Sequence, residues 1–345
     1  MKRLGGPYAI ALGLSILGAS AAHAQLNIVI NPNATLSANP AALAAFNRAA
    51  AQWSSRITDN ITITVDAGLA SLGAGVIGST GNVTLQAGYD TIRDAMVADK
   101  PGNALLSALP TSAQFTATLP SGGTLDGLMS LTKANAKALG FQDLDTNFGT
   151  SDGNITFSTN FNFDYDNSNG VTAGFMDFET VAAHEIGHLL GFVSIVDSVD
   201  AGTITNTSPM PLDLFRFDST SAPTSLAAFT TTARDLRAGG TKVTSSANQN
   251  LFIGSGGSAT ANVGMSTGRF TGDGNQASHW KADDITGVNI GIMDPTLNFG
   301  QTTPVGFNDL IAMSLIGYNL AAVPEPSSVL LLLAPGMLLF LKRRR

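Results

Sequence analysis

The chain contains no cysteine, and its 345 residues include only four histidines and three glutamates. Without cysteine, neither a disulfide-stapled small fold nor a cysteine-ligated zinc site can form. Hydrophobic residues make up 44% of the sequence, so a chain of this length can bury a core without covalent cross-links. Because histidine and glutamate are so scarce, each residue of these two types can be considered individually as a metal ligand or a catalytic group.

Both ends of the sequence have the composition of targeting segments. Lys2 and Arg3 precede an apolar run over residues 9–22, which ends in Ala22-His23-Ala24. This pattern predicts a secretory signal peptide over residues 1–24. At the other end, Val-Pro-Glu-Pro at 323–326 leads into an apolar stretch and four basic residues. Residues 25–322 are therefore expected to form the mature protein.

The charge of residues 25–322 excludes some partners. The two end segments hold six of the 18 Lys and Arg but only one of the 25 acidic residues, which leaves 12 basic and 24 acidic residues. The resulting formal charge of −12 repels phosphate, and no basic stripe runs through the sequence. We therefore expect no nucleic-acid partner, and acidic substrates are disfavoured as well.

The C-terminal segment is short for a membrane anchor. Its apolar stretch, residues 329–341, would form a helix of roughly 20 Å, whereas the hydrocarbon core of a bilayer is about 30 Å thick. The segment resembles the PEP-CTERM sorting signal of Gram-negative bacteria, which an exosortase cuts during export. The resemblance implies location in the cell envelope, at the surface or in the extracellular matrix, exosortase-type machinery as a partner, and transient membrane association. A permanent transmembrane tail anchor is the alternative.

Helical and strand patterns alternate in the first half of the mature chain. Asn39 and Pro40 begin one predicted helix, whereas Asp177 caps and Gly191 ends another. Residues 194–274 are rich in Ser, Thr, Gly and Asn and predict an irregular region with strand-like pieces at 212–217 and 250–253. The remaining expected elements are strands over 26–30, 61–65 and 154–159 and helices over 40–56, 89–99, 125–139, 178–190 and 307–318.

His184-Glu185-Ile186-Gly187-His188 falls within the predicted helix over 178–190. Histidines four residues apart project from one helix face, so both imidazoles can reach one cation, and Glu185 lies beside them to handle a proton. Two core histidines with a neighbouring glutamate are the structural alternative, but this would require hydrogen-bond partners for three polar groups within one turn. The spacing favours zinc-dependent hydrolysis.

A zinc site needs at least three protein ligands, and His279 is the one histidine left outside the predicted signal peptide. Glu179 and Glu185 are the only glutamates before the C-terminal segment, so a glutamate ligand from a later helix is nearly excluded. Aspartates downstream of the helix stay open as alternative third ligands: Asp197, Asp200, Asp213, Asp218 and Asp273.

The stretch from His184 to Phe192, His-Glu-x-x-His-x-x-Gly-Phe, resembles the opening of the metzincin zinc signature. Ser194 occupies the usual position of the third ligand, three residues after the glycine. In leishmanolysin-like peptidases a long insertion displaces that histidine to a Ser-His-Trp motif shortly before a methionine turn. Here Ser278-His279-Trp280 precedes Gly-Ile-Met-Asp-Pro at residues 291–295.

The resemblance implies a zinc metalloprotease of the metzincin type, related to bacterial PEP-CTERM-sorted metalloproteases. His184, His188 and His279 would be ligands of Zn²⁺, and Glu185 would be the general base. Gly191 would turn the chain away from the active helix, and Met293 would lie under the metal.

The fold implied is α+β and zincin-like, in two parts. Residues 25–192 would form an N-terminal subdomain with a mixed sheet and the zinc helix. Residues 193–322 would form an irregular C-terminal subdomain that carries the third ligand and the methionine turn and ends in a helix.

Two further patterns carry expectations. By resemblance to such proteases, an extended peptide is expected to add to an edge strand of the sheet, for which residues 154–159 are the candidate. The sequence Asp164-x-Asp166-x-Ser168-x-Gly170 resembles part of a calcium loop, but it lacks glycine at the sixth position and glutamate at the twelfth. A plain turn is therefore favoured there.

Together these features predict an exported zinc endopeptidase that hydrolyses peptide bonds in a protein or peptide substrate. The alternative is a non-catalytic envelope or biofilm-matrix protein, in which zinc only braces the fold. That reading gives more weight to the low charge, the Ser, Thr, Gly and Asn content and the sorting segment.

Overall fold

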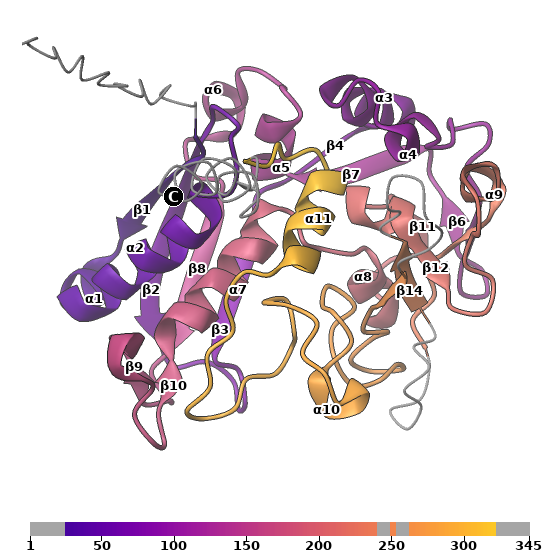
Figure 1. Cartoon of the computed structure of the whole chain (residues 1–345). Coiled ribbons are helices and arrows are strands. Elements are labelled where there is room, and N and C mark those ends of the chain that lie inside the picture. The colour runs from indigo at the N-terminus through magenta and orange to yellow at the C-terminus, as the bar shows by residue number, and fades with distance from the viewer. Residues whose placement is uncertain (1–24, 240–248, 253–261, 322–345) are drawn as a thin grey trace, which may run out of the picture.

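The computed structural model of the chain describes residues 25–239, 249–252 and 262–321 (Figure 1). The predicted signal peptide and the predicted sorting segment lie outside these residues. Within the described ranges, no helix combines the length and the apolar character needed to cross a bilayer.

A four-stranded mixed sheet is the centre of the first half of the chain. Its strands β1 (Asn27–Pro32), β2 (Thr62–Ala70), β8 (Gly153–Ser158) and β3 (Gly78–Asn82) follow one another in that order. The first three are parallel, and β3 pairs antiparallel to β8 at the edge. Buried side chains alternate along β2, as expected for a strand with one face against the core. The fold is mixed α+β, as predicted.

Helices α2 (Pro40–Ser54) and α7 (Phe178–Leu190) pack against each other beside this sheet (Figure 1). The indole Nε1 of Trp53 in α2 donates to the carbonyl of Ala183 in α7 at 2.8 Å. Glu179 of α7 accepts hydrogen bonds from Arg48 at 2.9 Å and Gln52 at 2.8 Å. One of the two glutamates within residues 25–322 therefore joins these two helices.

The remaining elements are short or lie around this centre. The other helices are α1 (Ala34–Ser37), α3 (Tyr89–Asp99), α4 (Ala104–Ser107), α5 (Lys133–Ala138), α6 (Leu144–Phe148), α8 (Val196–Asp200), α9 (Leu226–Thr231), α10 (Asp283–Thr286), α11 (Phe307–Leu315) and the 3₁₀ turns η1 (Asn167–Asn169) and η2 (Pro211–Phe215). The other strands are β4 (Thr84–Gly88), β5 (Ala117–Thr118), β6 (Thr124–Leu125), β7 (Leu128–Thr132), β9 (Phe163–Asp164), β10 (Met176–Asp177), β11 (Asn206–Thr207), β12 (Arg216–Asp218), β13 (Arg234–Asp235), β14 (Gln249–Phe252) and β15 (Asn262–Gly264).

The helix expected over residues 125–139 is wrong for its first half. Residues 128–132 form strand β7, which pairs antiparallel with β4, and only residues 133–138 are helical. Gly127 has φ of +78°, a left-handed conformation that a helix cannot continue through. The apolar residues of this segment are compatible with both the helical and the strand periodicity. Pairing with β4, some forty residues earlier in the chain, favours the strand.

Two other predicted elements differ in detail. Residues 211–215 form the 3₁₀ turn η2 rather than a strand, because the Asp213 carboxylate accepts the backbone N–H of Met210 at 2.9 Å and closes the turn. The last helix, expected over 307–318, ends at Leu315, and Gly306 is its N-cap.

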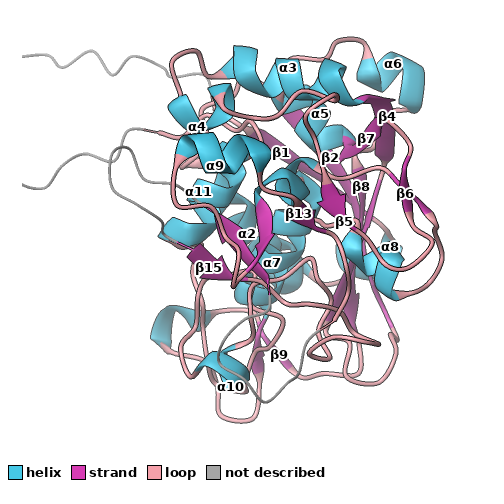
Figure 2. Ribbon diagram, turned by 90° about the vertical axis from the view of Figure 1, so that its right-hand side faces the viewer, coloured by secondary structure: helices cyan, strands magenta, loops and turns pink. Residues whose placement is uncertain are grey.

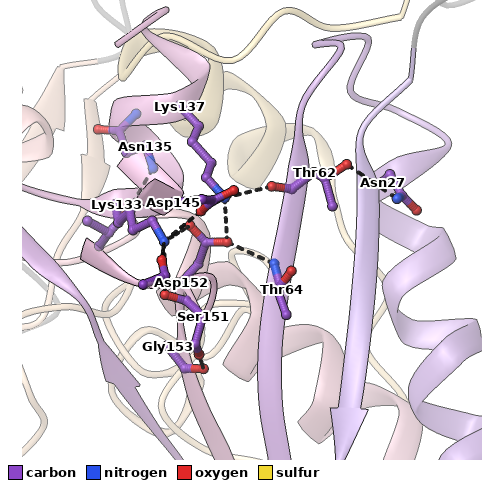
Figure 3. Close-up of polar contacts among 12 residues, drawn as sticks. Asn27, Thr62, Thr64, Lys133, Asn135, Lys137, Asp145, Ser151, Asp152 and Gly153 are labelled. Atoms are coloured by element: carbon purple, nitrogen blue, oxygen red, sulfur yellow. Dashed lines mark hydrogen bonds and ion pairs between the residues drawn. The ribbon is translucent and has the colours of Figure 1, made fainter. Parts of the chain in front are cut away.

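A network of charged side chains joins α5 to the beginning of β8 (Figure 3). Asp152 is fully buried and accepts from the backbone N–H of Thr64 at 2.8 Å and from Lys137 at 2.9 Å. Lys133, also fully buried, contacts the half-exposed Asp145 at 2.7 Å. The network fixes the position at which β8 enters the sheet.

The second half of the chain has few long elements, as its composition predicts. Figure 2 shows the short elements α8, α9 and α10 connected by loops. One hydrophobic cluster nevertheless runs through both halves and includes side chains from α7, η2 and α11. The division into two subdomains at residue 192 stays a prediction.

Candidate metal centre

Three imidazoles converge at one point of the structure. The Nε2 atom of His184 lies 3.1 Å from that of His188 and 3.1 Å from that of His279, and His188 and His279 are separated by 3.2 Å. His184 and His188 lie one turn apart on α7, whereas His279 follows His188 by 91 residues. The cluster predicted from sequence is therefore assembled, and no other such group of metal-binding side chains occurs in the described residues.

Hydrogen bonds on the far side of each ring fix its tautomer. The Nδ1 atoms lie 2.8 Å from the carbonyl of Ile292 for His184, 2.9 Å from that of Phe192 for His188 and 3.1 Å from that of Gln276 for His279. A carbonyl only accepts, so each Nδ1 carries the proton and donates. Each neutral ring then directs the lone pair of its Nε2 toward the other two.

Burial keeps the three rings neutral. It is the main cause that lowers the pKa of each histidine from 6.5 to about 3, and a neighbouring imidazole lowers it further. The backbone hydrogen bond at each Nδ1 opposes this shift. Neutral imidazole is the form of histidine that binds metal ions.

The arrangement fits a tetrahedral metal such as zinc. Zinc binds imidazole nitrogen at about 2.0–2.1 Å, and a tetrahedral angle then separates two such nitrogens by about 3.3–3.4 Å. The observed separations of 3.1–3.2 Å are close to that value. Three lone pairs directed at one another without an intervening proton repel, whereas a cation between them would bind all three.

The loop that carries His279 is fastened to the end of α7. Asp197, in α8, accepts the backbone N–H of Ala277 at 2.6 Å and the N–H and hydroxyl of Ser278. The Ser278 hydroxyl in turn accepts the backbone N–H of Ser194 at 2.9 Å. Ser194, which stands where the metzincin signature has its third ligand, therefore helps to hold the loop that carries His279.

Strand β12 supports the same loop from the other side. The guanidinium of the buried Arg216 donates to the carbonyl of Ala277 at 3.0 Å and to that of Ser266. Ser266 donates its backbone N–H to the carbonyl of His279 at 3.0 Å. Two residues after His279, the buried ammonium group of Lys281 pairs with the buried carboxylate of Asp273 at 2.6 Å. The irregular half of the chain thus acts as a scaffold for the third histidine.

The five aspartates that were alternative ligands are used elsewhere. Asp197 holds the Ser278 loop, and Asp213 accepts from Ser194, Ile195 and Met210. Asp200 accepts from Phe270 and Thr271. The remaining two have local partners: Asp218 accepts from Thr220, and Asp273 pairs with Lys281.

Glu185 is buried beside the cluster and held by strand β3. The hydroxyl of Thr80 donates to its carboxylate at 2.6 Å. A Cβ atom added to Gly78 would lie 2.5 Å from Glu185 Oε1, so only glycine leaves room for the carboxylate. Burial raises the pKa of Glu185 to about 7, against the effect of the Thr80 hydrogen bond. A carboxyl group with such a pKa can both take and return a proton near neutral pH.

Gly191 and Met293, the two residues to which the resemblance assigns supporting roles, both adjoin α7. Gly191 ends α7 with φ of +119° and lets the chain turn toward Ser194. Met293 is fully buried, and its backbone carbonyl accepts the N–H of Trp280 at 2.9 Å. Its thioether packs on Gly187, between the two histidines of α7.

The cluster forms part of the wall of a cleft of about 510 Å³. Strand β3, helix α7, the loop around His279 and residues 292–297 line it. This volume lies within the range of about 300–1,000 Å³ that is typical of ligand-binding pockets. The chemistry available in the cleft is therefore that of a three-histidine metal site with an adjacent carboxylate.

Sequence reasoning missed Thr80 and Gly78 and the positioning role of Asp197. Neither Thr80 nor Gly78 stands in a pattern that indicates a site, because each meets Glu185 only through the packing of β3 on α7. Asp197 is among the alternative ligands that the sequence offers, but its contact with Ser278 spans 81 residues and no local pattern indicates it. The Asp164–Gly170 segment forms a turn in which Asp164 accepts from Asp166 and Thr172, as favoured.

Comparison with known proteins identifies no relative. No family model matches the sequence, and none of the curated proteins or solved structures compared with it matches either. The function is accordingly inferred from the site.

Proposed function

We propose that this protein is a zinc-dependent endopeptidase of the metzincin type, with a leishmanolysin-like ligand layout. The observation that carries the proposal is the convergence of three neutral imidazole Nε2 atoms, 3.1–3.2 Å apart, on the wall of a cleft that also holds Glu185. His184, His188 and His279 would hold the zinc ion. When bound, zinc supplies a Lewis acid that polarises the scissile carbonyl and lowers the pKa of water toward about 7.

Glu185 is the general base of the proposed reaction. Its carboxylate takes a proton from the attacking water and passes it to the leaving amine. Thr80 holds one carboxylate oxygen at 2.6 Å and leaves the other to accept that proton. The backbone hydrogen bonds at the three Nδ1 atoms keep the imidazoles oriented while the proton moves.

The strand available to an extended peptide is β3, which corrects the expectation for residues 154–159. Those residues belong largely to β8, which is paired on both sides, with β2 and with β3. β3 has β8 on one side only, and all but one of its residues line the cleft. A peptide that adds to this edge would lie along the histidine cluster.

The targeting features complete the proposal. The signal peptide and the sorting segment, both outside the described residues, would direct export to the envelope, the cell surface or the extracellular matrix of a Gram-negative cell. Exosortase-type processing would then release the transient membrane contact of the C-terminal segment. The substrate class is a protein or peptide, and the acidic mature chain gives no support for nucleic acid.

The alternative, a matrix protein with a structural zinc ion, is less well supported by the site. Structural zinc sites are closed by four protein ligands, whereas three candidate ligands meet here in the described residues, on the wall of a cleft. A buried carboxylate beside the site has no part in a purely structural role.

The test uses matched glutamine variants at the two glutamates of α7. Glu185→Gln should retain zinc and lose hydrolysis of casein, whereas Glu179→Gln, which changes only the contact with α2, should retain both. A chelator should abolish hydrolysis by the unaltered protein, and added zinc should restore it. Full activity of Glu185→Gln would refute the assigned base, and zinc binding without any hydrolysis would favour the structural alternative.

A companion measurement tests the ligand set. His279→Ala should lose zinc, as measured by metal content after dialysis, whereas Asp218→Asn, a change at a half-buried rival aspartate that accepts from Thr220, should retain it. Retention by His279→Ala together with loss in an aspartate variant would assign the third ligand to that aspartate.

A further inference from the structure

Asp309 is a fully buried carboxylate on the first turn of α11 that accepts four hydrogen bonds. Its Oδ2 atom takes the backbone N–H groups of Ile292 at 2.9 Å and Gly306 at 2.8 Å. Its Oδ1 atom takes the indole N–H of Trp280 at 2.7 Å and, at 3.4 Å, the backbone N–H of Met293. Three separate stretches of chain therefore meet on one side chain.

Two of those stretches hold the candidate metal ligands. Ile292 donates its N–H to Asp309, and its carbonyl accepts the Nδ1 proton of His184 at 2.8 Å. Trp280 is the neighbour of His279, and its backbone N–H donates to the carbonyl of Met293 at 2.9 Å. One carboxylate thus fixes the peptide that orients His184 and the residue next to His279.

Close approach of Asp309 to this loop depends on glycine. A Cβ atom added to Gly291 would lie 2.4 Å from Asp309 Oδ1. The four surrounding groups are all donors, so the position requires a side chain that only accepts. An asparagine there would place its own NH₂ against N–H groups.

We propose that Asp309 is a positioning residue of the metal centre, which sets the orientation of His184 through Ile292 and the place of His279 through Trp280. This inference rests on the proposed function only in that the three histidines bind a metal ion. Groups that orient metal ligands from behind typically change metal affinity 10–100-fold when they are replaced. Asp309 is expected to act in that range although it contacts none of the three imidazoles.

The experiment measures zinc affinity by competition with a chromophoric chelator, and the visible absorption of the Co²⁺ form reports ligand geometry. The variant is Asp309→Asn, and the matched control is Asp59→Asn. Asp59 is also buried and accepts from the backbone N–H and the side-chain amide of Asn319, beyond the other end of α11. Asp309→Asn should lower zinc affinity 10–100-fold and change the Co²⁺ spectrum. Asp59→Asn should lower the thermal midpoint but leave affinity and spectrum unchanged.

A second, milder variant tests the proposal if Asp309→Asn does not fold. Trp280→Phe removes a single donor to Asp309 and keeps an aromatic ring against Phe192, so it should give a smaller loss of affinity in the same direction. Unchanged affinity and spectrum in folded Asp309→Asn, or in Trp280→Phe if that variant alone folds, would overturn the proposal. An equal loss in Asp59→Asn would do so as well. Absence of zinc binding by the unaltered protein would instead defeat the proposed function.

Discussion

Met293 packs on Gly187 so closely that a Cβ atom added to the glycine would lie 2.3 Å from the methionine Sδ. Gly187 stands between His184 and His188 on α7, and Met293 is fully buried. Glycine in the interior of a helix costs about 1 kcal/mol relative to alanine. The Met293 thioether takes the space that a side chain at residue 187 would occupy, so its packing offsets that cost.

The first prediction concerns this contact. Gly187→Ala should lower the free energy of unfolding by up to about 2 kcal/mol, because overpacking costs about 1–3 kcal/mol and the gain in helix propensity returns only about 1 kcal/mol. In the double variant Gly187→Ala/Met293→Ala the two changes should be less than additive, because the added methyl group occupies space that the smaller side chain vacates. Urea unfolding of the two single variants and the double variant measures this coupling. Additive losses would show that the two residues do not share the space.

The second prediction concerns the hydroxyl that holds the proposed base. Thr80→Val keeps the shape of the side chain but removes the donor to Glu185. The value of kcat/KM for a peptide substrate should therefore fall about 10–150-fold, the equivalent of the about 1.5–3 kcal/mol that one hydrogen bond to a charged group contributes. Zinc content should not change, because Thr80 contacts none of the histidines in the cluster. Thr80→Ser, which retains the hydroxyl, should recover most of the activity. Equal losses in the two variants would mean that packing of β3 on α7, rather than the hydroxyl, matters.

The third prediction concerns the charged side chains between α5 and the beginning of β8 (Figure 3). Asp152→Asn leaves the buried ammonium groups of Lys133 and Lys137 with Asp145 as their remaining carboxylate partner among the described residues, so the free energy of unfolding should fall by about 3–5 kcal/mol. The matched control is Asp94→Asn in the exposed pair with Arg93, which should cost about 0–1 kcal/mol. Denaturant unfolding compares the two. If the two variants lost similarly small amounts of unfolding free energy, the buried network would contribute no more to stability than the exposed pair.

The fourth prediction is a pH dependence of stability. Lys100 donates to the carbonyls of Ser314 and Tyr318 and to the Ser314 hydroxyl, and burial lowers its pKa from 10.5 to about 8. Between pH 8 and 10.5 the unfolded chain binds more protons at this group than the folded chain, so its contribution makes stability rise with pH. The rise should be visible from pH 8 to about 9.5 in thermal unfolding and absent in Lys100→Met. A variant that keeps the same rise would assign it to another group.

Local signals predicted the helix that begins the site. Asp177 accepts the N–H of Thr180 at its start, and Gly191 ends it in a left-handed conformation, so its bounds of 178–190 were correct. The helix over 89–99 was equally accurate. The positions of His184 and His188 on one face follow from helical geometry alone, and the census of histidines left one remaining candidate for a third.

Sequence periodicity failed where two distant segments decide the outcome. Strand β7 was predicted as helix because its apolar residues fit both periods, and its partner β4 was not recognised at all. Strand β3, Gly-Ser-Thr-Gly-Asn, has little hydrophobic character and no strand pattern. It forms because its backbone pairs with β8 and because its glycine leaves space for Glu185.

The sequence by itself determined the composition of the candidate centre: two histidines one turn apart, the carboxylate between them and a single further histidine within residues 25–322. Only the tertiary structure decided that His279 completes the cluster, that β3 is the open edge and that Asp309 joins the supporting loops. The reason is physical. Helix periodicity and capping act over a few residues, whereas these contacts depend on hydrogen bonds and packing between segments that are remote in sequence.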